Sequence, residues 1–122
     1  MKHVITTKRI YDKPLKKDGY RILVDRLWPR GISKDEIKID DWEKMLAPSV
    51  NLRKWFGHDP ELWSEFQKKY KAELKKNKAV DDFIEKFKDK HTLTLLYAAK
   101  DEAHNHALVL KEYLEHYMHN EA

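Results

Sequence analysis

The stretch TLTLLYAA at residues 92–99 decides the fold. It is a short, almost unbroken apolar run, which predicts the most buried strand of the protein. A second run of this kind, YRILVDRL, occupies residues 20–27, and the β-branched stretch HVITTKRIY at 3–11 predicts a further strand. Near-continuous apolar strands between helices indicate a sheet that is at least partly parallel and covered on both faces. We therefore expect a small Rossmann-like α/β fold, with a mostly parallel sheet of three to four strands flanked by helices.

The connection between the first two strands does not suit a simple α/β alternation. Residues 12–19 contain Pro14 and the turn pair Asp18-Gly19, so they are predicted to form a loop. A parallel crossover normally needs about a dozen residues or more, usually including a helix. Either these two strands are antiparallel, or the linker crosses without a helix.

Helix starts are marked by capping residues. Capping-box patterns at residues 33–36 (SKDE) and 40–43 (DDWE) each predict a helix N-terminus. Ser49 is expected to cap a short helix that ends near Gly57, and Asp59-Pro60 to begin a helix that runs to about residue 77. Apolar residues at 80–87 indicate another helix, and Asp101 is expected to cap the last one.

Length and composition suit one domain over residues 1–122. The chain has no Cys, which excludes a disulfide framework, a thiolate nucleophile and a Cys-ligated metal or iron–sulfur site. No apolar run approaches the roughly 20 residues of a membrane span, and the N-terminus lacks the apolar region of a signal peptide. We expect a cytoplasmic protein that does not contact a membrane.

Charge is distributed unevenly along a chain whose formal net charge is +4. All five Arg lie within the first 53 residues, whereas Lys is spread widely and is dense over 68–90. Lys on amphipathic helices usually solvates a face, while Arg is a planar bidentate donor suited to carboxylate and phosphate groups. The N-terminal part is therefore the better place to look for anion binding.

A first candidate site follows the strand at 20–27. Its residues are Asp25, Arg26, Trp28, Arg30 and Gly31. They lie at the carboxyl end of a predicted strand and just before the predicted helix start at residue 33. Ligands bind at such strand ends in open α/β sheets, and helix N-termini attract anions. The alternative is a rigid turn with Trp28 in the core, Arg30 in solvent and Asp25 paired with a nearby Arg.

A second candidate site follows the strand at 92–99 and contains Asp101, His104, Asn105 and His106. If the two strands are parallel, this loop and the Arg30 loop share one rim of the sheet. His104 and His106 cannot share a helical face, and we favour His106 as the functional one. Asp101 has capping as its simpler explanation.

His58, in the loop before residue 60, is a third candidate for acid–base chemistry, because histidine is the side chain whose unperturbed pKa lies nearest to neutrality. Capping explains its neighbour Asp59. No metal site is expected, although His104 and His106 have the form of an HxH pair. No cofactor is expected either, because the chain lacks a Walker loop, a GxGxxG and a nucleophile elbow.

Several long segments resemble a known family. The segments at 21–31, 46–49, 52–60, 95–101 and 105–107 are similar to the YeaO-like branch of domain-of-unknown-function family 488. The resemblance covers roughly residues 8–115 and implies a compact Rossmann-like domain. Other branches have Asp-Val-Arg, then Pro and Ser-Arg, after one strand, and Cys-His-Arg after a later strand. Asp25, Arg26, Pro29 and Arg30 match the first pattern loosely, and His106 alone matches the second. The resemblance implies no established activity.

Two functional hypotheses follow. In the first, the protein is a hydrolase or group transferase for an anionic, phosphate-bearing or nucleotide-like substrate. Arg26, Arg30 and Arg53 would hold the anion, His106 or His58 would move a proton, and Asp25 or Asp101 would orient it. In the second, it is a non-catalytic module that binds nucleic acid or protein through its basic helices and Trp residues, or a regulatory domain that binds a small anion. The oligomeric state stays open.

Overall fold

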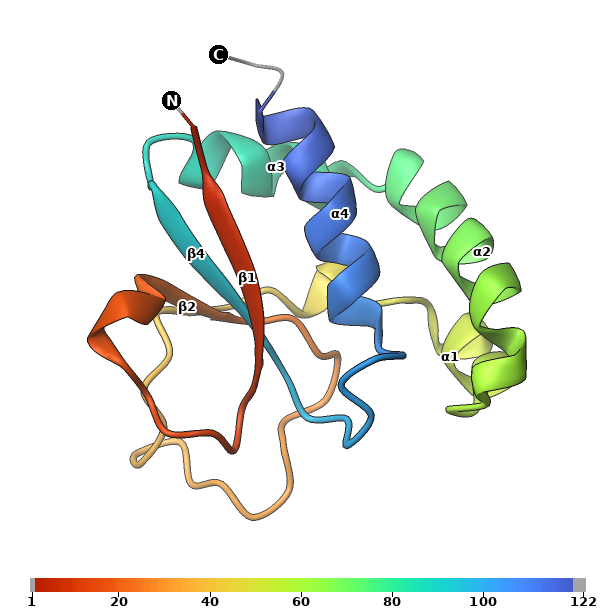
Figure 1. The fold of residues 1–122 in the computed structure, drawn as a ribbon, viewed down its shortest axis with the longest axis horizontal. Coiled ribbons are helices and arrows are strands. Elements are labelled where there is room, and N and C mark those ends of the chain that lie inside the picture. Colours follow the sequence, from red (N-terminus) through yellow and green to blue (C-terminus); the bar gives the residue numbers. More distant parts are fainter. Residues whose placement is uncertain (1, 120–122) are drawn as a thin grey trace.

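A computed structural model describes residues 2–119 and has a four-stranded, all-parallel sheet flanked by four α-helices (Figure 1). The strands are β1 (Val4–Arg9), β2 (Tyr20–Leu23), β3 (Asp41–Trp42) and β4 (Thr92–Tyr97), and the spatial order is β1-β4-β2-β3. The helices are α1 (Val50–Phe56), α2 (Trp63–Lys75), α3 (Lys78–Phe87) and α4 (His106–His119). Three 3₁₀ turns are η1 (Lys16–Asp18), η2 (Lys44–Leu46) and η3 (Pro60–Leu62). The expected α/β fold with a parallel sheet is confirmed.

Strand β4 holds the sheet together because it pairs with both β1 and β2. Five of its six residues are buried, as the apolar run at 92–99 predicted. The strands are shorter than the apolar runs that predicted them. Each run continues beyond the last strand residue into the loop that follows. Those strand-end loops carry the candidate site.

The linker between β1 and β2 crosses without an α-helix, which settles the question left open by its length. β4 is inserted between the two strands, so all three remain parallel and the linker needs only the short turn η1. Gly19 ends this turn with φ +66, and a Cβ there would lie 2.4 Å from the carbonyl oxygen of Thr92. Only glycine allows the linker to approach β4 this closely.

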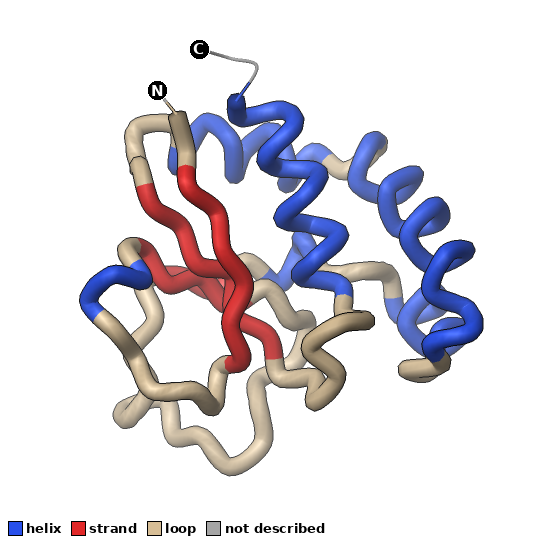
Figure 2. Tube along the Cα trace, viewed as in Figure 1, coloured by secondary structure: helices blue, strands red, loops and turns tan. Residues whose placement is uncertain are grey.

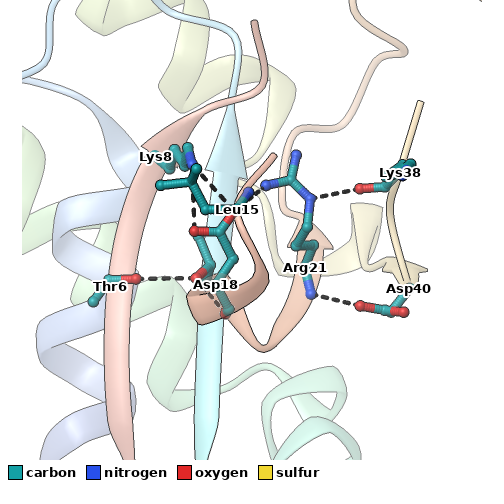
Figure 3. A network of polar contacts seen from close by, with 8 residues as sticks. Thr6, Lys8, Leu15, Asp18, Arg21, Lys38 and Asp40 are labelled. Carbon is teal, nitrogen blue, oxygen red and sulfur yellow. Dashed lines mark hydrogen bonds and ion pairs between the residues drawn. The ribbon is translucent and has the colours of Figure 1, made fainter. Parts of the chain in front are cut away.

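A buried ionic network anchors the same linker (Figure 3). The carboxylate of Asp18 accepts hydrogen bonds from Lys8 Nζ at 3.1 Å, from the Leu15 amide at 2.9 Å and from Arg21 Nη1 at 2.5 Å. Arg21 Nε in turn donates to the Lys38 carbonyl. The network therefore ties the linker to β1 and β2, and also to the segment that precedes β3.

The two faces of the sheet are covered differently. All four α-helices pack over one face and form a single large apolar cluster with residues of every long strand. The other face has a small cluster of Ile10, Leu23 and Leu96, covered by side chains from loop 24–40 and from β3. Figure 2 shows how much of the molecule away from the helices is loop. Both faces are covered as expected, but a loop replaces helices on one of them.

The helix predicted from the SKDE pattern does not form. Ser33 Oγ accepts from the Asp35 amide and the Ser33 carbonyl from the Glu36 amide, so the pattern makes one isolated turn. The DDWE pattern at 40–43 does not start a helix either, because Asp41 and Trp42 form β3 beside β2. In both places burial of apolar side chains against the second sheet face outweighs the local capping signal.

The helix signals at Ser49, Gly57 and Asp59 hold. Ser49 Oγ accepts from the Leu52 amide, and Gly57 ends α1 in the left-handed conformation. Asp59 caps η3, which runs directly into α2, and α2 ends at Lys75 rather than at about residue 77. No helix in the described part of the chain is long and apolar enough to cross a membrane.

Candidate functional site

The loops that follow β2 and β4 meet at the carboxyl edge of the sheet. The Ala98 amide donates to Asp25 Oδ2 at 3.0 Å. His106, the first residue of α4, donates from Nε2 to the Val24 carbonyl at 2.9 Å. These two bonds bring Asp25 and His106 together, and Arg26 follows Asp25 along the chain. We call these three residues the strand-end site.

Asp25 and His106 form the one contact in this cluster that suits proton transfer. His106 Nε2 lies 3.2 Å from Asp25 Oδ1, and both side chains are more than four-fifths buried. Asp25 Oδ1 is fully buried and has no hydrogen bond with good geometry. Because Nε2 faces a carbonyl, it must carry the hydrogen, so in neutral His106 the acceptor is Nδ1.

Arg26 binds the protein itself. Its Nη2 donates to the carbonyls of Ala47 and Pro48, each at 3.2 Å, and its Nε donates more weakly to Pro48. These bonds fasten the end of β2 to the segment that leads into α1. The hydrogen bonds of the Arg26 guanidinium therefore go to backbone carbonyls, which would otherwise lack donors.

Asp101 and Asn105 lie in the segment that leads into α4. The prediction that Asp101 caps this helix is wrong, because Asp101 lies too far before the first helical residue. Asp101 accepts from the Ala103 and His104 amides and from His104 Nδ1, so it closes a turn before the helix. The bonds from Ala103 and then from His104 lower the pKa of Asp101. The helix itself begins at His106, and Asn105 Oδ1 accepts from the Leu108 amide at 3.3 Å. Asn105, which is buried, is the residue in the capping position.

Trp28, Arg30 and Gly31 lie on the loop that covers the second sheet face. Trp28 Nε1 donates to the Ile32 carbonyl at 2.7 Å, and its ring meets Trp42 edge-on, so Trp28 is part of the smaller apolar cluster. Arg30 is exposed, and within residues 2–119 its guanidinium makes no hydrogen bond or ion pair. The helix N-terminus expected beside it is absent, which removes the main structural argument for an anion site there.

His58 and Arg53 lie apart from the strand-end site. Both are exposed on or just after α1, and His58 has φ +59 with its ring 6.4 Å from Phe56. No contact joins either side chain to Asp25 or His106 within the part of the chain described. That same part contains no cluster of three or more His, Asp or Glu arranged to hold a metal ion.

Tyr70 is a polar neighbour that was not among the site residues predicted from the sequence. It is fully buried on α2, donates its hydroxyl to the Leu46 carbonyl and meets the His106 ring edge-on at 6.2 Å. Burial raises the pKa of Tyr70 well above its usual value, and the carboxylates of Glu73 and Asp25 raise it further. A Tyr in a stripe of Leu and Phe was the available signal, because its buried hydroxyl requires a partner.

Comparison with known proteins shows to which family this chain belongs. A family model described as the inactive DUF488-N3 subclade matches residues 4–122. The chain belongs to this family. It is 46% identical to the uncharacterised protein YeaO of Escherichia coli K12 over 110 residues, which are 90% of this chain and 96% of YeaO. The uncharacterised protein Rv3073c of Mycobacterium tuberculosis H37Rv is 37% identical to this DUF488-N3 member over 90% of the chain and 92% of its own length. No solved structure matches.

Proposed function

We propose that this DUF488-N3 protein is a cytoplasmic, non-catalytic module that binds single-stranded nucleic acid. The binding surface is formed by Lys54 and Trp55 of α1 with Lys68 and Lys69 of α2, and we call it the Trp55 patch. One observation carries the proposal: Trp55 is 41% exposed, and Lys69 Nζ lies 5.0 Å from the centre of its ring. An exposed indole beside ammonium groups suits a stacked base with phosphates on either side.

The segment that carries the Trp55 patch is basic. Residues 50–78 contain eight Lys and Arg against four Asp and Glu, so this segment alone matches the net charge of +4 for the whole chain. Lys54, Lys68 and Lys69 are all exposed. Arg53 does not belong to the patch, because residues two positions apart on a helix point to nearly opposite sides. The predicted anion-binding role of Arg53 is therefore not part of this proposal.

The strand-end site favours a non-catalytic role. Arg26 donates to two backbone carbonyls, Asp25 accepts a backbone amide and His106 donates to a third carbonyl. Groups bonded in this way stabilise the junction between strands and α4, and a substrate would have to break those bonds. The description of the matching family as inactive agrees with this.

Hydrolysis or group transfer on an anionic, phosphate-bearing substrate remains the second candidate function. It is favoured by one observation, the 3.2 Å contact between His106 Nε2 and Asp25 Oδ1. Such a carboxylate orients the ring and leaves Nδ1 to accept a proton. This candidate predicts turnover of a phosphate ester that is lost in His106→Gln, whereas the Trp55 proposal predicts unchanged oligonucleotide binding in that variant.

The test is binding of a fluorescein-labelled 15-nucleotide oligothymidylate, followed by anisotropy between 50 and 200 mM salt. Affinity should fall steeply with salt, and Lys68→Glu/Lys69→Glu should weaken binding and reduce the log–log salt slope by about 1 to 2. The matched control is Lys16→Glu/Lys17→Glu, which makes the same charge change on the exposed turn η1, on the far side of the sheet from α2 (Figure 1).

Stacking is tested separately from charge. Trp55→Leu keeps an apolar side chain but removes the indole, and it should weaken binding by about 5- to 100-fold, as for loss of one base–aromatic stack. Equal losses in the two charge-reversal variants would refute the patch, since only net charge would then matter. An unaffected Trp55→Leu variant would refute the single-strand assignment.

A further inference from the structure

A cavity of about 330 Å³ lies between α2 and α4, and it is separate from both the strand-end site and the Trp55 patch. It is lined by Lys71 of α2 and by Glu112, Tyr113, His116 and Tyr117 of α4. These residues lie near the carboxyl-terminal half of α4, at least one and a half turns from His106. No group discussed above uses this cavity.

Aromatic rings form most of its wall. The rings of Tyr113 and Tyr117 are 4.7 Å apart and inclined at 40°, and the His116 ring stands at 89° to that of Tyr117 at 4.9 Å. The electron-rich faces of such rings attract cations, and sets of aromatic walls are the usual means of recognising alkylated ammonium groups. The walls therefore favour a positively charged ligand with an apolar surface.

The carboxylates near these rings also favour a positively charged ligand. Burial, the neighbouring Tyr117 hydroxyl and the carboxylate of Asp81 together raise the pKa of Tyr113 to about 12. Glu112 adds a second carboxylate at the edge of the cavity. The carboxylates of Asp81 and Glu112 are therefore the anionic groups that a cation bound against these rings would meet.

In the structure without a ligand, the ammonium of Lys71 is the cation that pairs with Glu112 at the edge of this cavity. Its Nζ is 2.8 Å from Glu112 Oε1, but the two side chains are 40% and 64% exposed. Exposed ion pairs of this kind contribute little to stability and open readily. We propose that the cavity binds a small organic cation of the alkylated-ammonium class against Tyr113 and Tyr117, and that the ligand displaces Lys71 from Glu112.

The test is an NMR titration of the whole protein with tetramethylammonium chloride. Sodium chloride at equal ionic strength controls for salt, and tert-butanol provides a neutral probe of similar bulk. Backbone amides over 112–117 should shift with tetramethylammonium and saturate in the millimolar range, and they should respond far less to either control. The position of these shifts identifies the cavity independently of any variant.

Three variants separate the contributions. Tyr117→Leu, at a half-exposed position, should weaken binding about 2- to 5-fold through the loss of one cation–π wall. Glu112→Gln should weaken it by a similar factor. Lys71→Gln should instead tighten it about 2- to 5-fold, because the competing ammonium is removed. Glu85→Gln is the control, since it breaks an exposed ion pair of the same length on α3 and should change nothing.

Lys71→Gln gives the clearest result, because removing the ammonium that competes for Glu112 should tighten tetramethylammonium binding, whereas the other two variants should weaken it. Weaker binding in that variant overturns the proposal. So does a response to tert-butanol equal to that with tetramethylammonium, or an absence of shifts over 112–117 up to 100 mM ligand. Circular dichroism of each variant checks that altered binding does not come from unfolding.

Discussion

Replacing Asp18 by Asn tests whether the buried ionic network holds the helix-free crossover in place (Figure 3). The Asp18 and Arg21 side chains are each only 7% exposed, and Lys8 is 16% exposed. Removing the carboxylate charge leaves two cations without their shared anion in a region that water barely reaches. Breaking one partner of a buried ion pair typically costs about 3–5 kcal/mol.

The Asn amide oxygen can still accept one hydrogen bond, so the lower end of that range, about 3 kcal/mol, is expected at pH 7. For a chain of this size the loss corresponds to a fall in Tm of about 12 °C. The measurement is urea unfolding at equilibrium. The matched control is Asp12→Asn, which removes an exposed carboxylate from the same linker and should change stability by less than about 0.5 kcal/mol.

The loss should also depend on pH. Burial raises the pKa of Asp18, but the Leu15 amide, Lys8 and Arg21 lower it by more, so the pKa lies below the usual value in the folded protein. A carboxyl group with a depressed folded pKa contributes stability above its unfolded pKa of about 4, and that contribution disappears as pH falls through the folded pKa. The difference between wild type and Asp18→Asn should therefore shrink below about pH 4. A loss under 1 kcal/mol at pH 7, or one that persists unchanged in acid, would refute the reasoning.

Two further substitutions test local features. Ser49→Ala removes the N-cap of α1 and the bond from the Ser49 hydroxyl to Glu73, so it should lower the free energy of unfolding by about 1–2 kcal/mol. Ser64→Ala on the exposed face of α2 should have little effect in the same urea titration. Gly19→Ala should lower Tm by more than Gly31→Ala, because both residues have positive φ but only at Gly19 would the new Cβ overlap a β4 carbonyl. Equal thermal shifts in the two Gly variants would show that close approach to β4 is unimportant.

Local sequence signals determined much of the helical half of the fold. Ser49 and Gly57 mark both ends of α1 because a cap and a left-handed glycine act within a single turn. The apolar run at 92–99 predicted the buried central strand because such a run leaves no polar face for solvent. Long-range pairing was different, because nothing local in residues 12–19 shows that β4 enters between β1 and β2.

Loop 24–40 shows where local signals fail. The SKDE sequence at 33–36 matches the capping-box pattern, yet the segment forms one turn because Trp28 and its apolar neighbours cover the second face of the sheet. Burial of those side chains contributes several kcal/mol, whereas a helix cap contributes about 1 kcal/mol. Only the tertiary structure could show that this loop takes the place of a helix layer.

The same division applies to the candidate site. The sequence placed Asp25 and His106 after two buried strands, and parallel pairing brings such ends to one edge of a sheet. It could not show that Arg26 donates to carbonyls before α1, or that Trp55, at 41%, is the most exposed of the four Trp. Which donor meets which acceptor, and which ring stays in solvent, depends on contacts between residues far apart in the chain. The order of residues therefore indicated where polar groups gather, and long-range packing left only some of them, and one Trp ring, exposed to a partner.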